Sequence, residues 1–74
     1  MKEHDDVELI VEKESYVKNK AHKGMTGTIV WPESKGGTWL VEFHDIEPWY
    51  DEKGLFHAGI ITVKEDDLLL IRES

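Results

Sequence analysis

The four histidines are the residues of this chain with the most versatile side-chain chemistry. Imidazole and carboxylate groups together bind several divalent metal ions. The best candidate trio is His44, Asp45 and His57, which come from neighbouring predicted strands. No two histidines have the i, i+4 spacing of a helical metal site or the short spacing of a known metal motif. We therefore interpret the histidines as scattered surface residues and predict no metal site.

Residue types that perform hydrolysis or nucleophilic catalysis are present without the patterns that such catalysis needs. Acid–base hydrolysis requires two carboxylates in different environments, and the sixteen Asp and Glu residues include no pair that stands out. None of the three serines lies in a nucleophile-elbow pattern. Gly36-Gly37 indicates a hairpin turn rather than a phosphate-binding loop. We therefore expect no enzyme activity and no cofactor.

Residues 45–52 combine two adjacent aromatic side chains with four acids. Aromatic residues surrounded by charge are typical of the positions that dominate the binding energy of protein interfaces. Two interpretations stay open for Trp49: it docks a partner, or it folds back over the open end of the fold. Trp31 stands at a strand end, where we expect it to be half covered. The predicted partner-binding residues are Asp45, Glu47, Trp49, Tyr50, Asp51, Glu52 and Trp31.

A short basic stretch offers an alternative site for nucleic acid. Lys18, Lys20 and Lys23, with His22 among them, lie within six residues that contain no acid, and lysines bind phosphates. The whole chain, however, has nine basic and sixteen acidic residues and a net charge of -7. Its field therefore repels nucleic acid and favours a basic partner. We interpret the lysines as part of a solvated loop.

Short apolar runs separated by polar breaks predict strands rather than long helices. A long polar loop is expected at 13–24, a turn at 32–37, and an acidic loop at 45–54, which is broken by Pro48. A single 3₁₀ turn is expected at 64–67. A helix at 65–72 is the alternative, which its short length disfavours. The predicted strands are 7–12, 24–31, 38–44, 55–63 and 68–71.

The strand pattern predicts an all-β domain with one core. Val7, Leu9 and Val11 share one strand face at period two, and Trp39 and Phe43 fall on an inward-facing register. Seventy-four residues provide apolar surface for only one domain, which we place at 7–74 after a flexible N-terminus at 1–6. Five strands with a long loop between the first two predict a small closed barrel, which hides its strand edges.

The motif Gly24-x-x-Gly27-x-Ile29, which opens a strand after a polar loop, resembles the glycine pattern of KOW-type and other SH3-like barrels. The segments 41–43 and 61–68 resemble small bacterial SH3-like families of unknown function. They are also similar to the barrel shared by a photosystem I reaction-centre protein and the variable chain of ferredoxin–thioredoxin reductase. The resemblance covers residues 7–72 and implies a five-stranded SH3-like barrel with a short 3₁₀ turn before the last strand. The KOW likeness implies RNA or ribosomal partners.

Three functions follow as hypotheses. The first is a non-catalytic module that binds a basic protein, in its sharpest form an immunity or inhibitor protein whose acidic surface mimics phosphate. The second is a KOW-like RNA- or ribosome-associated module that uses the lysines. The third is an accessory subunit of an electron-transfer or metalloenzyme complex. No apolar run approaches the roughly 20 residues of a membrane span, and the absence of cysteine fits the reducing cytoplasm.

Overall fold

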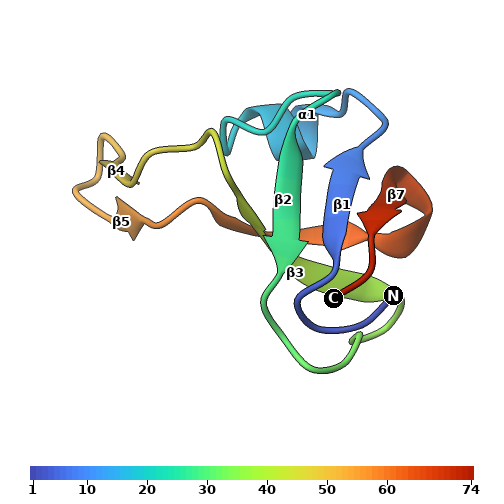
Figure 1. Ribbon diagram of the computed structural model, residues 1–74. Helices are drawn as coiled ribbons and strands as arrows, with labels where there is room; N and C mark the ends of the chain where they lie inside the picture. Colours follow the sequence, from blue (N-terminus) through green and yellow to red (C-terminus); the bar gives the residue numbers. More distant parts are fainter.

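The computed structural model describes all residues from 1 to 74, and its main element is a five-stranded antiparallel sheet. Strands lie in the order β6-β3-β2-β1-β7, so the first and last strands of the sheet in sequence are hydrogen-bonded neighbours (Figure 1). Every pair in the sheet is antiparallel. The strands are β1 (Asp6–Leu9), β2 (Thr26–Ile29), β3 (Thr38–Phe43), β6 (Ile60–Lys64) and β7 (Leu68–Arg72).

A second, two-stranded sheet is a hairpin that projects from the body of the molecule (Figure 1). Its strands are β4 (Trp49–Tyr50) and β5 (Phe56–His57). The segment 45–54, which we predicted to be a loop, thus contains β4. The segment 55–63, which we predicted to be a single strand, is divided between β5 and β6. Both predictions are wrong in these details. Gly59 separates β5 from β6 because its backbone has a φ of +78°, where a side chain is strained. A Cβ there would also lie 3.0 Å from the Ile46 carbonyl oxygen.

The long excursion between β1 and β2 contains a helix that the sequence did not predict. α1 (Glu14–Val17) is a single turn, and Tyr16 at its centre is only 5% exposed. The Tyr16 hydroxyl donates a 2.6 Å hydrogen bond to Asp67 and accepts one from the Lys64 backbone N–H. Lys13 binds the same Asp67 carboxylate at 2.8 Å. These hydrogen bonds thus hold the segment between β1 and β2 against the end of β6 and the turn that follows it.

That turn is a 3₁₀ helix, η1 (Glu65–Asp67), which leads directly into β7. The prediction of a 3₁₀ turn and a last strand is confirmed, and the alternative helix at 65–72 does not form. Neither helix is long and apolar enough to cross a membrane.

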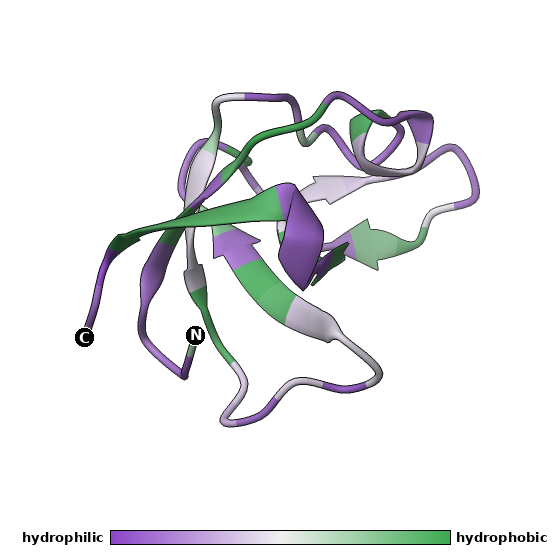
Figure 2. Cartoon of the chain, turned by 90° about the vertical axis from the view of Figure 1, so that its right-hand side faces the viewer, coloured by the Kyte–Doolittle hydropathy of each residue, from purple (hydrophilic) through white to green (hydrophobic).

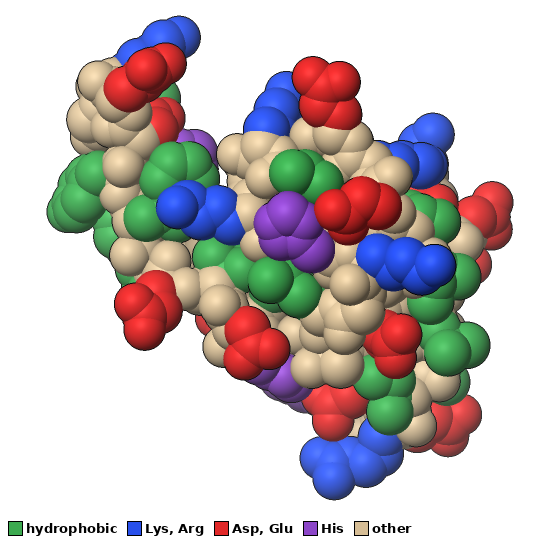
Figure 3. Space-filling view, turned by 90° about the horizontal axis from the view of Figure 1, so that it is seen from above, with side chains coloured by type: hydrophobic (Ala, Val, Ile, Leu, Met, Phe, Trp, Pro, Cys, Tyr) green, Lys and Arg blue, Asp and Glu red, His purple; other side chains and the backbone are tan.

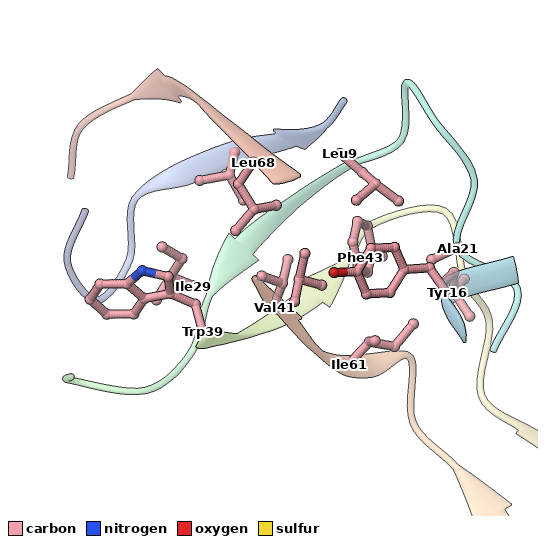
Figure 4. Close-up of a cluster of buried hydrophobic side chains, with 12 residues drawn as sticks. Leu9, Tyr16, Ala21, Ile29, Trp39, Val41, Phe43, Ile61 and Leu68 are labelled. Carbon is pink, nitrogen blue, oxygen red and sulfur yellow. The ribbon is translucent and has the colours of Figure 1, made fainter. Parts of the chain in front are cut away.

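The core lies on one face of the sheet and is completed by residues from outside it (Figure 4). Most inward positions predicted from alternation are buried, with Val7, Leu9 and Phe43 at 0–2% exposure. Val11 is the exception, because it lies beyond the end of β1 and is only partly buried. Ala21 from the excursion and Ile46 from the segment after β3 join them. The full buried cluster is Val7, Leu9, Tyr16, Ala21, Ile29, Trp39, Val41, Phe43, Ile46, Ile61, Val63 and Leu68.

Strand boundaries differ from the predicted ones by several residues at the N-terminal end of the chain. β1 begins at Asp6, inside the segment 1–6 that we expected to be flexible. Asp5 is 1% exposed, and its carboxylate accepts hydrogen bonds from the backbone N–H groups of Lys2 and Ser74. The all-β prediction is confirmed at the level of the sheets. β6 and β7 are the two edge strands of the large sheet and do not pair with each other. The hydrogen bonds between strands therefore do not close the sheet into the predicted barrel.

Candidate functional site

The projecting hairpin, residues 45–59, is here called the arm, and Asp51 holds it together. The Asp51 carboxylate accepts hydrogen bonds from the backbone N–H groups of Lys53 and Leu55 at 2.9 and 3.0 Å. Its other oxygen lies 2.9 Å from Nε2 of His57. The His57 contact and then the Leu55 N–H hold the pKa of Asp51 below its ordinary value. One ionised side chain therefore fixes a turn between strands of only two residues each.

Trp49 connects the arm to the body. Its ring stacks on His57 with centroids 4.4 Å apart and an angle of 18° between the planes. Nζ of Lys20 lies 4.6 Å from the centroid of the same ring, within cation–π range. Trp49 also packs against the core and is partly buried. Of the two open interpretations, the structure favours Trp49 as a support that folds back on the body.

The far end of the arm carries the exposed apolar side chains. Tyr50, Leu55 and Phe56 are 70%, 60% and 56% exposed. The rings of Tyr50 and Phe56 meet edge to face with centroids 5.3 Å apart. Figure 3 shows this lobe at the upper left, with hydrophobic side chains beside acidic and basic ones. Because the rings hold each other in place, little side-chain entropy remains to be lost when a partner covers them.

The predicted acids divide into two groups in the structure. Asp45, Glu47 and Glu52 are exposed and free to face a partner. Asp51 is partly buried and its oxygens are occupied by the turn and by His57. The arm therefore presents three exposed negative charges, two at its base and one in its turn, where Lys53 is also exposed, while the fourth acid supports its shape.

Trp31 does not join the arm. It is 52% exposed and lines a hollow with Trp39 and Leu40, at the end of β3 opposite the arm. The register explains this, because the Val30 N–H bonds to the Leu40 carbonyl while the His44 N–H at the other end bonds to Thr26. The structure brings together the predicted residues 45–52 and leaves Trp31 apart.

The lysine loop, residues 18–23, lies against the arm rather than on a separate face. Lys18 lines a shallow hollow with Trp49, Asp51, Glu52 and His57. Lys20 has a left-handed backbone with a φ of 72°, which is costly for a lysine. His22 Nδ1 and the Lys23 N–H bind the Glu12 carboxylate at 2.9 and 2.6 Å. Glu12 therefore holds this loop through His22 and the Lys23 backbone, without an ion pair to a lysine side chain.

The two histidines of the candidate trio, which we interpreted as surface residues, lie in different hydrogen-bond networks. His44 contacts the Thr28 hydroxyl at 2.8 Å, and Thr28 also donates to Asp6. His57 contacts Asp51. No group of three His, Cys, Asp or Glu side chains is placed to hold a metal ion.

Leu55 and Phe56 belong to the exposed tip but were absent from the predicted site. They were assigned to the predicted strand at 55–63 and not to a binding site. A usable signal was present, because the aromatic pairs 49–50 and 56–57 flank a polar stretch that ends in Gly54. Two short β-favouring runs around a glycine-containing break indicate a hairpin.

Comparisons with known proteins returned no match: no family model, no curated protein and no solved structure is similar to this chain.

Proposed function

We propose that this chain is a non-catalytic protein-binding module whose arm docks a basic protein. The observation that carries this proposal is the exposed cluster of Tyr50, Leu55 and Phe56 on a hairpin that stands clear of the body. Large rings that are exposed and mutually fixed are costly to keep in water and gain most from burial in an interface. A hairpin that served only the fold would be expected to turn them inward.

Charge supports a basic partner. Asp45 and Glu47 at the base of the arm and Glu52 in its turn are exposed, and the whole chain carries a net charge of -7. An acidic rim speeds association with a basic surface and disfavours acidic competitors. An immunity or inhibitor role against a basic enzyme is the sharpest form of this proposal, and an accessory subunit of an enzyme complex is a broader one.

The topology supports an SH3-like barrel as the scaffold of the module. A sheet of five strands, a long segment after β1 and a 3₁₀ turn before β7 are features that the sequence analysis expected of such a barrel. In this scaffold the arm is the connection between β3 and β6. A rigid sheet that presents a variable connection is a common way to build a binding site.

The non-catalytic part of the proposal is supported by how the buried acids are used. Asp5 accepts two backbone N–H groups, and Asp67 binds Tyr16 and Lys13. Groups that are saturated with structural hydrogen bonds are poorly suited to donate or accept a proton from a substrate.

An affinity capture tests the proposal. The immobilised chain is exposed to nuclease-treated lysate of its source organism, and retained proteins are quantified for three forms. These are the unaltered chain, the double variant Tyr50→Ala/Phe56→Ala, and Trp31→Ala as a matched control. Trp31 is the suitable control because it is a similarly exposed aromatic residue outside the arm.

We expect one basic protein to be retained by the unaltered chain and by Trp31→Ala, and to fall at least about tenfold for the double variant, since hot-spot residues contribute that much or more. Equal retention by all three forms would remove the arm from the proposal. If ribosomal proteins and RNA are retained only without nuclease, and are lost on changing Lys18, Lys20 and Lys23 to Glu, the RNA-associated alternative replaces it.

A further inference from the structure

We infer that the hollow beside Trp31 is a binding site for a neutral glycan, one of whose sugar rings stacks on the Trp31 indole. The hollow lies at the end of β3 opposite the arm, so this inference does not rest on the proposed role of the arm. One of its walls is the loop 30–37, which Figure 2 shows at the bottom of the view in mostly neutral and hydrophilic colours. Its volume is about 510 Å³, within the range of small-molecule sites, about 300–1,000 Å³. It is also the most enclosed of the four hollows on the surface.

Hydrogen bonds hold the walls of this hollow in place. Lys35 and Thr38 bond to each other through their backbones across the turn at Gly36-Gly37, with N–O distances of 2.9 and 3.1 Å. The Thr38 hydroxyl donates a further 2.6 Å hydrogen bond to the Lys35 carbonyl. On the opposite wall, Nε1 of Trp39 donates to Glu65 at 2.8 Å, and Trp39 is only 6% exposed. Because the walls are formed in advance, a ligand loses little free energy in ordering them.

Trp31 provides a flat apolar surface that the core does not use. Its side chain is 52% exposed and does not belong to the buried cluster. A six-membered sugar ring whose hydroxyl groups are equatorial presents a flat face of C–H groups. Stacking this face on an indole removes apolar area of both partners from water. Trp31 therefore favours chains of β-linked glucose or N-acetylglucosamine, which have this configuration.

The polar groups around Trp31 favour a neutral ligand that carries hydroxyl groups. Glu33 and Lys35 both line the hollow and form no ion pair within the protein, so their opposite charges compensate each other there. A cation would be repelled by Lys35, and an anion by Glu33 and by the net charge of -7. Sugar hydroxyls donate to a carboxylate and accept from an ammonium group, so a glycan uses both charges. Ser34 and Thr62 add two hydroxyls, which also donate and accept.

Nuclear magnetic resonance titration of the isotope-labelled chain tests the inference with three probes. These are cellohexaose, N-acetylated chitohexaose and, as a cation, tetramethylammonium chloride. We expect a glycan to shift the indole N–H resonance of Trp31 with a dissociation constant of about 0.1–1 mM, while the resonance of Trp49 in the arm stays unchanged. Trp31→Ala should raise this constant at least about tenfold. The double variant Tyr50→Ala/Phe56→Ala is the matched control and should bind the glycan normally.

Glu33→Gln separates a neutral ligand from a cation without changing a buried residue. The variant removes a charge but keeps an amide that forms hydrogen bonds, so glycan affinity should change by less than about threefold, whereas a cation site would lose most of its affinity. No shift of the Trp31 indole with either glycan at about 5 mM would overturn the inference. Equal shifts at Trp31 and Trp49, or a shift caused by tetramethylammonium at lower concentrations than by the glycans, would also overturn it. Loss of glycan binding in the Tyr50→Ala/Phe56→Ala control would move the site to the arm and overturn it as well.

Discussion

Nζ of Lys20 lies 4.6 Å from the centroid of the Trp49 ring, and this contact joins the two segments that offered alternative binding sites in the sequence. The lysine loop and the arm are therefore one continuous surface. Lys20 stands at the base of the arm, in the same hollow as Asp45 and Glu47, while the turn at the far end carries the exposed residues Glu52 and Lys53. A nucleic acid that followed the lysines would therefore meet acids at the base of the arm.

The different burial of Trp49 and Tyr50 gives a stability prediction. We expect Trp49→Ala to lower the free energy of unfolding by about 2 kcal/mol, because the ring is partly buried against the core and stacked on His57. Tyr50→Ala should change it by less than about 0.5 kcal/mol, since Tyr50 is 70% exposed. Urea unfolding measures both. Equal effects of the two variants would contradict the assignment of Trp49 as support and Tyr50 as contact.

The buried hydroxyl of Tyr16 gives a second prediction. It donates a 2.6 Å hydrogen bond to Asp67, which is 6% exposed. We expect Tyr16→Phe to cost about 1–3 kcal/mol of unfolding free energy, because a buried carboxylate loses one of its two side-chain donors. Tyr16→Ala should cost about 3–5 kcal/mol, since the ring also leaves the core. If Tyr16→Phe is as stable as the unaltered chain, the hydrogen bond contributes nothing to the fastening of the excursion.

The pH dependence of stability follows from Asp67 and Asp5. Burial raises the pKa of Asp67, but the hydrogen bonds from Lys13 and Tyr16 outweigh it and the net shift is downward. The Ser74 N–H is the main cause of the lowered pKa of Asp5. Carboxyl groups with a lower pKa in the folded state stabilise it above the unfolded pKa, and this contribution is lost as the pH falls through the folded pKa.

We therefore expect the free energy of unfolding to be level near neutral pH and to fall between about pH 5 and pH 2. Thermal unfolding followed by circular dichroism across this range provides the measurement. Asp67→Asn should be less stable at neutral pH and should lose part of the acid dependence. An unchanged acid dependence in that variant would show that other carboxylates are responsible.

The Gly24-x-x-Gly27 motif makes a further prediction, because its two glycines serve different purposes. A Cβ on Gly27 would lie 2.6 Å from the Glu42 carbonyl oxygen and 2.7 Å from Cγ1 of Val41. A Cβ on Gly24 would meet nothing within 4 Å, but the φ there is +94°. We expect Gly27→Ala to cost about 3 kcal/mol or more through overpacking of β2 against β3. Gly24→Ala should cost only about 1–2 kcal/mol of backbone strain. Urea unfolding of the two variants compares them, and a milder effect at position 27 would contradict the close strand contact.

Alternation and turn residues in the sequence were sufficient to predict the large sheet. The inward register of Val7, Leu9, Trp39 and Phe43 and the 3₁₀ turn before the last strand are period-two and local signals, and they are confirmed. The helical turn α1 was missed because four residues carry no usable periodicity. It forms because Tyr16 is drawn into the core and bound by Asp67, which is 51 residues away in the chain.

The candidate site was predictable only in part for the same reason. Residues 45–52 were identified from composition, and they form the first part of the arm. Leu55 and Phe56 were missed because an apolar residue at the start of a predicted strand is normally assigned to the core. They point outward because the strand is interrupted at Gly59 and because Asp51 holds the turn before them. The pattern of apolar residues in the sequence predicts neither the direction of these side chains nor the hydrogen bonds of Asp51.

The last prediction concerns Asp51, whose carboxylate holds the turn of the arm through Lys53, Leu55 and His57. We expect Asp51→Ala to speed hydrogen exchange at the Leu55 amide severalfold while leaving exchange in β1 and β3 unchanged, because local openings of a small hairpin are independent of the main sheet. Retention of the basic partner should fall as it does for Tyr50→Ala, since Tyr50 and Phe56 would no longer be held against each other. Glu52→Ala is the matched control, because it removes a neighbouring exposed acid whose side chain makes no hydrogen bond in the turn. If Asp51→Ala and Glu52→Ala weaken binding equally while the Leu55 amide stays protected, charge rather than the shape of the arm determines docking.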